Sequence, residues 1–448
     1  MNPILLTDSY KASHWKQYPP NTTKIYSYLE SRGGMFDHTI FFGLQHILKE
    51  YLVGVRVTKE DVEEAKTFFN AHFGSDIFNY SGWMKLVEKH GGKFPIKIKA
   101  VPEGSRIPVS NVLMTVENTD PEFFWLTNYL ETILMQVWYP ITIATLSNEI
   151  RRVILSYLEK TGSSELIDFK LHDFGFRGVS SVESAGIGGA AHLINFMGTD
   201  TLPGILTLMK SYHAGVCGHS IPAAEHSTIT SWGQENEAKA YENMLTQFSE
   251  GLVAVVSDSF SIYNACKDIW GDQLKEQVLN RKGTLVIRPD SGDPATVVCS
   301  VLQILGNQFG YTVNSKGYKV LPPNVRVIQG DGIDYESIQH ILESMEILRW
   351  STDNVALGMG GALLQKLNRD TQKMAFKCSM IEKNEREFDV YKDPITDHGK
   401  RSKRGRLALV DCETVPGPAD NDMLRTVFEN GELLIDDTLS QIRERVNG

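Results

Sequence analysis

The second half of the chain repeats one pattern of apolar and polar positions. A short run of β-branched and other apolar residues is followed by a polar loop rich in Asp and Gly, and then by a helical stretch. Four copies are VAVVSDS (253–259), LVIRPDSGDP (285–294), RVIQGDGID (326–334) and VALGMGG (355–361). Their spacing of about 30 to 40 residues leaves room for a crossover helix between parallel strands, so the pattern predicts successive βα units.

The predicted fold class is therefore α/β, with a (β/α)8-like barrel as its main architecture. A doubly wound open sheet would give the same local pattern and remains an alternative at this point. In a barrel, the loops that follow the strands gather at one end and carry the active groups. The Asp, Arg and Gly residues of these loops would then lie near one another.

The two ends of the chain carry a different pattern. Residues 1–145 mix short β-prone runs (24–29, 96–101 and 111–116) with amphipathic stretches (59–72 and 123–137), which is typical of an α+β arrangement. Shorter mixed elements return from residue 375 onward. We therefore expect two domains: residues 1–145 with 375–448 form a mixed α+β domain, and residues 146–374 form the barrel-like domain.

The composition narrows the class of protein. Of the 448 residues, 42% are hydrophobic and 22% are charged, as in ordinary globular proteins. The 45 Lys and Arg against 55 Asp and Glu give a net charge of −10, which argues against a nucleic-acid partner bound through bulk charge. No stretch approaches the roughly 18 apolar residues of a membrane span. Five scattered cysteines without a C-x-x-C pair suit the reducing cytoplasm.

Two of the polar loops pair residues that suit a phosphosugar. IRPDSGDP places Arg288 and Asp290 at a strand end, where a guanidinium can bind phosphate and a carboxylate can bind sugar hydroxyls or hydrated Mg2+. QGDGID repeats this chemistry with Gly330 and Asp331. Each loop alone also fits a local ion pair and a turn, but two such loops in one chain favour a phosphosugar site.

The glycine-rich loop GMGGALLQK offers a second kind of phosphate contact. Gly358, Gly360 and Gly361 precede a helical run, where backbone amides unhindered by side chains can bind phosphate. Arg369, placed in a helical stretch farther on, could act as a bidentate anion clamp. A tight turn that needs positive φ, followed by an exposed helical Arg, explains the same residues without any ligand.

Three other loops hold further candidates. LHDFGFRG sets Phe174 close to Arg177, and a flat aromatic ring beside a cation suits a planar heterocycle next to an anionic group. His226 in PAAEHST can act as a base, an anion partner or a phosphoryl acceptor. Asp200 in GTDT is less telling, because Asp is common in turns. All four residues are also common in purely structural roles.

Taken in order, a set of long motifs resembles the nicotinamide phosphoribosyltransferases, a family of type II phosphoribosyltransferases. The motifs cover nearly the whole chain: TDSYKASHWKQYPP, LHDFGFRGVSS, GTDT, PAAEHSTIT, IRPDSGDP, VIQGDGID, LGMGGALLQKLNRD, FKCS and KRSKRGRL. The resemblance implies transfer of the phosphoribosyl group of 5-phosphoribosyl 1-diphosphate to nicotinamide, giving nicotinamide mononucleotide and diphosphate in NAD salvage. It also implies Mg2+, optional coupling to ATP hydrolysis, and a homodimer with sites at the subunit interface.

The resemblance also implies roles for individual residues. His226, Arg288 and Asp290 would act in catalysis, with His226 transiently phosphorylated by ATP. Arg177 would face the diphosphate with His226 and Arg288, while Phe174 and Tyr10 of the partner subunit would enclose the pyridine ring. Residues expected to hold the nucleotide product are Asp200, Asp290, Gly330, Asp331, Gly361 and Arg369. Residues expected to bring charge to the phosphate channel are Asp8, Arg32, Lys377 and Lys392. Carboxylates expected nearest to Mg2+ are Asp258 and Asp290.

The sequence departs from the family pattern at two places. GGMFDHT, after Arg32, is short where some members carry a longer charged insertion, and Ala254 stands where a serine is expected near the ring pocket. Nicotinate phosphoribosyltransferases share the fold and most phosphosugar residues, so nicotinate is the alternative substrate. A non-catalytic barrel that binds a nucleotide or a protein partner is a third reading. The combination of His226, Arg288 and Asp290 argues against it, because a binding module needs no phosphoryl acceptor.

Overall fold

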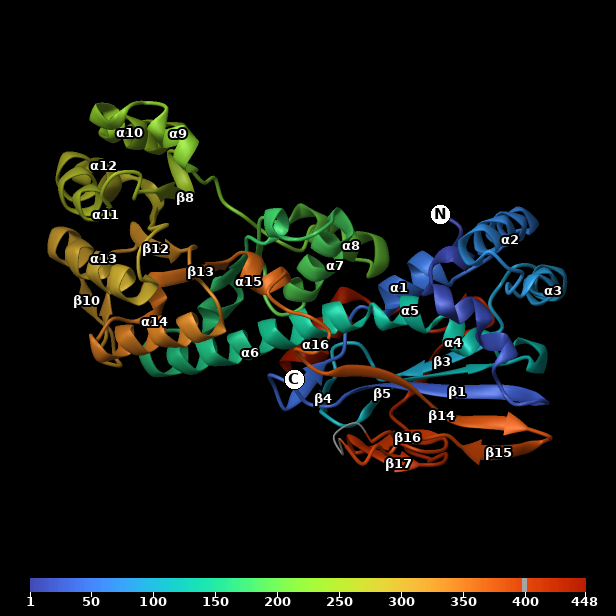
Figure 1. Ribbon diagram of the computed structural model, residues 1–448. Helices are drawn as coiled ribbons and strands as arrows, with labels where there is room; N and C mark the ends of the chain where they lie inside the picture. The colour runs from blue at the N-terminus through green and yellow to red at the C-terminus, as the bar shows by residue number, and fades with distance from the viewer. Residues whose placement is uncertain (397–400) are drawn as a thin grey trace. The chain divides into compact units, whose positions relative to one another are not determined.

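The computed structural model describes residues 1–396 and 401–448 (Figure 1). The chain forms two compact units. The barrel unit comprises residues 146–206 and 215–366, and the mixed unit comprises residues 1–145, 207–214 and 367–448. Lys400, the first residue of the KRSKRGRL motif, lies outside the described residues. Among the residues that are described, no helix combines the length and the apolar character that a membrane span requires.

The barrel unit is built on a six-stranded sheet in which all neighbouring strands are parallel. In sheet order the strands are β7 (Gly198–Thr199), β6 (Leu171–Asp173), β13 (Val355–Met359), β12 (Val325–Gln329), β9 (Lys282–Arg288) and β8 (Glu250–Val256). Four of them, β8, β9, β12 and β13, lie in the four repeated apolar runs of the sequence. The predicted succession of βα units is confirmed.

The two edge strands of this sheet both pair with one segment, residues 219–224. His219 forms a parallel bridge with Gly198 at the β7 edge, and Ala223 forms a parallel bridge with Ala254 at the β8 edge. The backbone N–H of Ala254 donates to Pro222 at 2.9 Å. This segment therefore closes the sheet into a ring. The barrel-like class is confirmed and the open sheet is excluded, although the described residues provide six strands and this segment rather than eight strands.

One layer of side chains fills the inside of the ring. Ala254, Val286 and Ile328 are buried against one another, and further side chains pack onto them. These further residues are Phe174, Ile221 and Ala356. Each of the six comes from a different strand, from the loop directly after a strand, or from the closing segment, as expected for a layer of a closed barrel.

The helices that follow β9 and β12 begin inside the polar loops. Asp293 accepts a hydrogen bond from the N–H of Thr296 at the start of α13 (Pro294–Phe309), and Pro294 occupies the first turn. Asp334 and Ser337 form a capping box at the start of α14 (Tyr335–Ile347). Caps of this kind satisfy the free N–H groups of a first helical turn. The loops DSGDP and GDGID therefore end strands and start helices at fixed positions (Figure 1).

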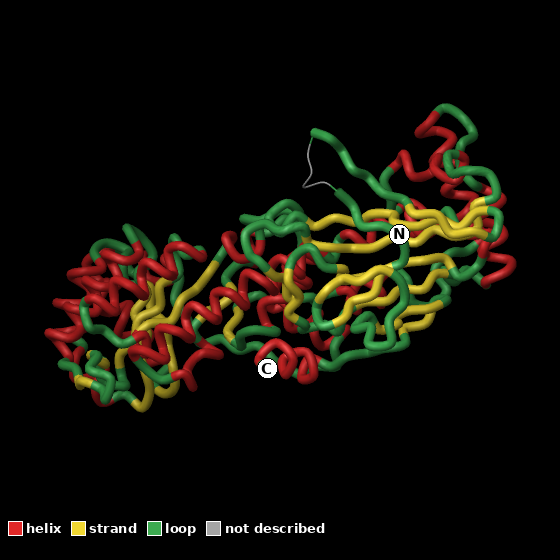
Figure 2. Tube along the Cα trace, turned by 90° about the horizontal axis from the view of Figure 1, so that it is seen from below, coloured by secondary structure: helices red, strands yellow, loops and turns green. Residues whose placement is uncertain are grey.

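The mixed unit is built on a seven-stranded sheet whose long strands lie side by side (Figure 2). In order the strands are β15 (Arg386–Asp389), β14 (Met374–Lys383), β1 (Thr22–Ser31), β5 (Val112–Asn118), β3 (Ile96–Ala100), β18 (Arg425–Glu429) and β19 (Glu432–Leu433). All paired neighbours are antiparallel. The three strands from the N-terminal part of the chain, β1, β5 and β3, lie in the middle of this sheet. Strands from the C-terminal part flank them on both sides, with β14 on β1 and β18 on β3.

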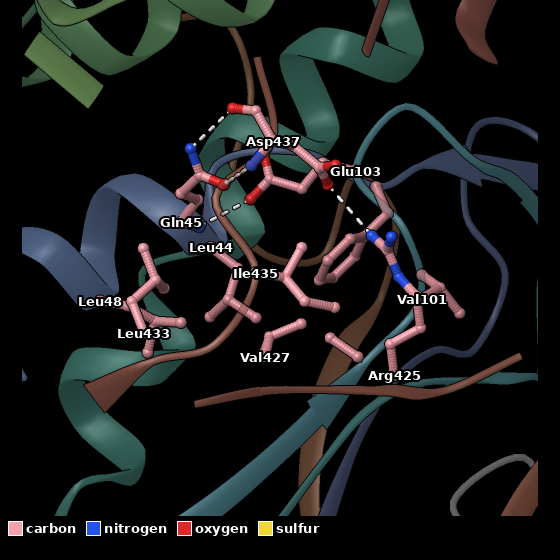
Figure 3. A pocket seen from close by; sticks show the side chains of 12 residues that line it. Leu44, Gln45, Leu48, Val101, Glu103, Arg425, Val427, Leu433, Ile435 and Asp437 are labelled. Carbon is pink, nitrogen blue, oxygen red and sulfur yellow. Dashed lines mark hydrogen bonds and ion pairs between the residues drawn. The ribbon is translucent and has the colours of Figure 1, made fainter. Parts of the chain in front are cut away.

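A pocket in the mixed unit lies beside the start of helix α1 (Leu44–Tyr51) (Figure 3). The carboxylate of Glu103 accepts from the backbone N–H groups of Gly43 and Gln45, at 3.1 and 2.6 Å. Burial raises the pKa of Glu103 to about 7. The side chain of Gln45 exchanges two hydrogen bonds with the backbone of Asp437, whose carboxylate pairs with Arg425. These contacts fix the C-terminal segment of the unit to α1.

Candidate active site

Most of the predicted barrel residues lie in the loops that follow the strands. Phe174 follows β6, Asp258 follows β8, Arg288 ends β9, Gly330 follows β12 and Gly360 follows β13. All five strands are parallel, so these positions belong to the same end of the ring. The structure thus brings together, at one mouth, residues that are far apart in the sequence.

The ring of Phe174 forms the floor of this mouth. It packs on Ala254, Val286 and Ile328, and the guanidinium carbon of Arg288 lies 5.8 Å from its centroid. A flat ring next to a cation can accept a planar heterocycle that carries an anionic substituent nearby. The sequence predicted a cation beside the ring of Phe174 but named Arg177 for it, whereas the structure places Arg288 there.

Gly358 is required by this ring and not by the backbone conformation. A Cβ atom built on Gly358 would lie 2.0 Å from Cε2 of Phe174. Neither Gly358, Gly360 nor Gly361 has positive φ. The explanation of this loop as a positive-φ turn is therefore wrong, because the glycine serves a close approach of backbone and aromatic ring.

Arg288, Asp290 and His226 are in direct contact. Arg288 donates to Oδ1 of Asp290 from Nη2 at 2.8 Å and from Nε at 3.2 Å. The other oxygen, Oδ2, lies 3.4 Å from Nε2 of His226. The local ion pair proposed as the plain alternative is thus present, but its carboxylate also faces a histidine from another loop. His226 is the first residue of α9 (His226–Thr230), and its side chain is half exposed at the mouth.

Asp258 completes this cluster from β8. Its Oδ1 lies 3.6 Å from Nε2 of His226, and its Oδ2 accepts from the hydroxyl of Ser291 at 2.5 Å. The other ring nitrogen of His226, Nδ1, lies 3.3 Å from the hydroxyl of Ser259. The histidine ring is therefore held between carboxylates on one side and a hydroxyl on the other. Sequence reasoning did not single out Ser259 or Ser291, although both stand next to residues that it did name.

The carboxylates of Asp258 and Asp290 fit a hydrated Mg2+. The side chain of Asp258 is only 5% exposed, yet its Oδ1 has no hydrogen-bond donor among the described residues. In the same described part of the chain, no three His, Cys, Asp or Glu side chains converge as a closed metal site. Mg2+ is commonly held by one or two carboxylates together with waters and substrate phosphates, so two neighbouring carboxylates are sufficient.

The loops after β6 and β13 touch each other. A Cβ atom on Gly178 would lie 3.2 Å from Cα of Gly361, the first residue of the short helix α15 (Gly361–Leu364). Arg177, one residue earlier, is exposed. After β12, Gln329 donates to the carbonyl of Asp331 at 2.9 Å and fixes the next loop. The loops after β6, β12 and β13, with the exposed Arg177 among them, therefore border the mouth.

The expected helical position of Arg369 is wrong. Helix α15 ends at Leu364, and Arg369 lies in a turn within the mixed unit. Asn368 organises this turn, because its side chain accepts from the N–H of Asp370 and its own N–H donates to the hydroxyl of Thr371. Side chains of this type compete with helical hydrogen bonds, which explains why the helix does not continue.

Asp200 lies at the end of β7, next to β6. Its N–H donates to the carbonyl of Asp173 at 2.9 Å, and its carboxylate accepts from the hydroxyl of Ser220. Burial, together with the charge of Asp200, raises the pKa of Asp173 to about 6. The edge of the mouth beside Phe174 is therefore acidic. Asp173 belongs to the LHDFGFRG motif, and only its burial distinguishes it.

Cationic residues gather on the sheet of the mixed unit. Burial lowers the pKa of Lys377 on β14, and the charges of Arg32, Lys392 and Arg369 lower it further. Arg32 donates from Nε to Glu30 at 2.7 Å. Four of the predicted phosphate-binding residues thus lie within electrostatic reach of one another, and their role stays a prediction.

The two remaining predicted residues of the mixed unit lie near its N-terminus. Tyr10 is exposed on the 3-10 helix η2 (Ser9–Lys16), and its ring packs edge-on against His14. Asp8 precedes this helix and accepts from the hydroxyl of Thr132 at 2.7 Å. An exposed tyrosine ring is available for contact with another molecule, which the role predicted for Tyr10 requires.

Two sequence models of known families match the chain. The nicotinate phosphoribosyltransferase (NAPRTase) family matches residues 169–432, and the N-terminal domain of nicotinamide phosphoribosyltransferase matches residues 2–98. The chain is 53% identical to a nicotinamide phosphoribosyltransferase of Xanthomonas campestris pv. campestris, over 99% of this chain and 97% of the relative. It is 33% identical to a nicotinamide phosphoribosyltransferase of Acinetobacter baylyi, over 100% of this chain and 97% of the relative.

Two solved structures share the fold. A nicotinate-nucleotide pyrophosphorylase from Pyrococcus furiosus is similar with a TM-score of 0.58 at 16% identity, over 100% of this chain and 95% of that chain. Human nicotinic acid phosphoribosyltransferase is similar with a TM-score of 0.56 at 15% identity, over 99% of this chain and 93% of that chain. At such low identity these two similarities concern the architecture alone.

Proposed function

This chain belongs to the nicotinate phosphoribosyltransferase family, and we propose that it transfers the phosphoribosyl group of 5-phosphoribosyl 1-diphosphate to nicotinamide. The products would be nicotinamide mononucleotide and diphosphate, in NAD salvage. The observation that carries the proposal is the position of Phe174 under Arg288, because one place then offers a platform for the pyridine ring and a cation for phosphate. The relatives from Xanthomonas and Acinetobacter, both named nicotinamide phosphoribosyltransferase, support nicotinamide as the base.

The reaction needs charge stabilisation and positioning more than acid–base chemistry. As the bond between the anomeric carbon and diphosphate breaks, positive charge develops on the ribose and negative charge on the leaving group. Arg288 and Arg177 would stabilise the diphosphate. The attacking pyridine nitrogen of nicotinamide is neutral and has no proton to lose, so no general base is required. Phe174 would hold the ring so that this nitrogen points at the anomeric carbon.

Asp258 and Asp290 would hold Mg2+ when it is bound. The ion supplies neutralising charge for the diphosphate, which adds to the effect of the arginines. Arg288 already neutralises Oδ1 of Asp290, so the orphaned Oδ1 of Asp258 is the strongest candidate ligand. The backbone amides at Gly360 and Gly361 would bind the 5-phosphate, with Gly330 and Asp331 at the ribose.

We further propose that ATP stimulates the reaction through His226. The carboxylates of Asp258 and Asp290 face Nε2, which suits the protonated nitrogen, while the other nitrogen, Nδ1, would attack once it leaves the hydroxyl of Ser259. Attack on the γ-phosphorus of ATP would form an N–P bond, break the bond to the bridging oxygen and release ADP. Hydrolysis of the phosphohistidine would then return the histidine and release phosphate.

The active form would be a cytoplasmic homodimer. Tyr10 of the partner subunit would cover the pyridine ring opposite Phe174, and the cations Arg32, Lys377 and Lys392 of the partner subunit would face the phosphates. The exposure of Tyr10 and the cluster of cations around Lys377 support this arrangement. A fully active species that sediments as a monomer at assay concentrations would contradict it.

Product analysis tests the central reaction. Purified protein is incubated with 5-phosphoribosyl 1-diphosphate, Mg2+ and either nicotinamide or nicotinate, and the mononucleotides are separated and quantified. Nicotinamide mononucleotide should form at the higher kcat/KM. A preference for nicotinate would replace this proposal with nicotinate phosphoribosyltransferase activity.

A second experiment tests the role of His226. The protein is incubated with ATP labelled at the γ-phosphate and is kept out of acid, because phosphohistidine is acid-labile. Wild type should take up label, and His226→Ala should lose both the label and the gain in rate that ATP produces. Undiminished label on His226→Ala would refute the assignment.

A further inference from the structure

A chain of buried side chains leads from helix α10 (Glu237–Gln247) toward the mouth of the barrel. Glu237, the first residue of α10, is only 8% exposed although it is ionisable. Its Oε1 accepts from the hydroxyl of Tyr241 at 2.7 Å, one helical turn later. Burial raises the pKa of Glu237, and the charge of Asp258 raises it further. Burying a carboxylate costs free energy, and the charge of Asp258 adds to that cost at Glu237. A carboxylate kept in such a place is therefore a candidate for a functional role.

Tyr241 stacks on Trp270 in nearly parallel geometry. The ring centroids are 4.5 Å apart and the planes differ by 7°. Trp270 is fully buried and lies on a π-helix, η7 (Ala265–Gln273). π-Helical turns are rare and frequently occur at functional sites. The indole Nε1 donates to the hydroxyl of Ser257 at 3.1 Å.

Ser257 links this chain of contacts to the site. It follows β8 directly and precedes Asp258. Its N–H donates to the carbonyl of Arg288 at 3.0 Å, and its hydroxyl donates to the carbonyl of Val255 at 2.9 Å. Ser257 is thus held by β9 on one side and by Trp270 on the other. Any shift of Ser257 moves the attached Asp258.

We propose that Glu237, Tyr241, Trp270 and Ser257 form a buried positioning chain that holds Asp258 against His226. The proposal rests on the proposed role of His226 as phosphoryl acceptor. The four members act through Asp258 and are positioning residues. The separation of 3.6 Å between Asp258 Oδ1 and His226 Nε2 leaves little tolerance, because small displacements of catalytic groups have large effects on rate.

A double-mutant cycle on the contact between Trp270 and Ser257 tests the proposal. Trp270→Phe removes the indole donor and Ser257→Ala removes its acceptor. Each single variant should lower the initial rate of label transfer from γ-labelled ATP to the protein by about tenfold, with KM for 5-phosphoribosyl 1-diphosphate unchanged within about twofold. The double variant should be no slower than the slower single variant, because both act through one contact.

Trp350→Phe is the matched control. Trp350 is also fully buried in the barrel unit, but its Nε1 has no hydrogen-bond partner among the residues described. This variant makes the same chemical change and should leave labelling at the wild-type rate. The proposal is overturned if the single variants take up label at the wild-type rate. It is also overturned if the double variant is slower by the product of the two single effects. If Trp270→Phe does not fold, Tyr241→Phe replaces it: this variant retains the indole and removes the hydroxyl that donates to Glu237. Its cycle with Ser257→Ala tests whether two other members of the chain act together, and additive losses would again overturn the proposal.

Failure of the proposed function would give a different result. If wild type takes up no label, the ATP step is wrong, and the cycle is then measured on the formation of nicotinamide mononucleotide without ATP. A non-additive loss in kcat at constant KM would still show that the chain positions Asp258, whereas additive losses would refute it.

Discussion

The cations at the two ends of the parallel sheet make different contacts. At the amino end, Lys170 donates to three backbone carbonyls at 2.8 to 3.1 Å, those of Thr352, Asp353 and Val355. Arg281 and Arg326, before β9 and at the start of β12, likewise donate to backbone carbonyls. At the carboxyl end, Arg288 pairs with the carboxylate of Asp290 and Arg177 is exposed.

This difference separates stability from function. A cation saturated by backbone carbonyls has no donor left for a ligand, and its removal leaves buried acceptors unpaired. A cation paired with a carboxylate can share its donors with a phosphate, and Mg2+ can then take up the carboxylate. The amino end therefore holds the strands in register, while the carboxyl end keeps cations available for substrate.

Replacement of Lys170 by Met should give the largest effect on stability. Met keeps the length of the side chain but removes the ammonium that donates to three backbone carbonyls, so the free energy of unfolding should fall by about 3 to 5 kcal/mol. Urea unfolding measures the loss, and kcat/KM of the remaining folded protein should equal that of wild type. Lys282→Met, at the start of β9 where the side chain is 85% exposed, is the control and should have no measurable effect. A loss below about 1 kcal/mol for Lys170→Met would contradict the assignment of the amino end.

The same kind of substitution at the other end should act on catalysis. Arg288→Met removes a charge-assisted contact to the diphosphate, which typically contributes about 1.5 to 3 kcal/mol, or a tenfold to hundredfold loss of kcat/KM. The Tm should change little, because the carboxylate that the guanidinium binds is partly exposed in the folded chain. Steady-state kinetics with varied 5-phosphoribosyl 1-diphosphate and a thermal melt test both halves of this expectation. Wild-type kinetics combined with a strongly lowered Tm would reverse the comparison.

The two ends also differ in how well the sequence predicts them. Arg288 and Asp290 stand two residues apart, so their contact is local and the motif reveals it. The approach of His226 to Asp258 spans 32 positions, 258 − 226, and follows only from the rule that barrel loops share one end. Lys170 was not predicted at all, because its partners are backbone carbonyls, which have no residue type and leave no motif.

Gly358 and Arg369 show a second reason for incomplete prediction. The apolar run followed by glycines correctly indicated a strand end, but the partner of Gly358 is the ring of Phe174, 184 positions away, 358 − 174. The helical pattern after Gly361 continues past the point where the helix ends, since the turn at Asn368 replaces it. In both cases a specific side-chain contact decided between conformations that the local pattern allowed equally.

Asp200 tests whether the carboxyl end also selects the base. An ionised carboxylate can accept a hydrogen bond from the amide of nicotinamide and repels the carboxylate of nicotinate. Asp200→Asn should therefore lower the ratio of kcat/KM for nicotinamide over nicotinate by about tenfold, with KM for the phosphosugar unchanged.

Ser220→Ala sharpens this test, because it removes only the hydroxyl that donates to Asp200. It should shift the ratio in the same direction by a smaller factor. If Asp200 serves only the turn, Asp200→Asn will lower the Tm and leave the ratio of the two substrates unchanged.

The smallest expected effect concerns Asp173. This residue is the last of β6 (Leu171–Asp173), at the carboxyl end of the strand, whereas Lys170 directly precedes the amino end. Its pKa is raised by burial to about 6, so between pH 4 and 6 the folded protein binds more protons at this group than the unfolded chain does. The stability that Asp173 contributes is therefore present below pH 4 and is lost as the pH rises through about 6.

Asp173→Asn keeps an acceptor for the N–H of Gly175 but cannot titrate. The Tm of wild type relative to this variant should fall by about 3 °C between pH 4 and 7, measured by calorimetry. Parallel pH profiles of the two proteins would mean that the carboxyl end holds Asp173 in its ordinary ionised form.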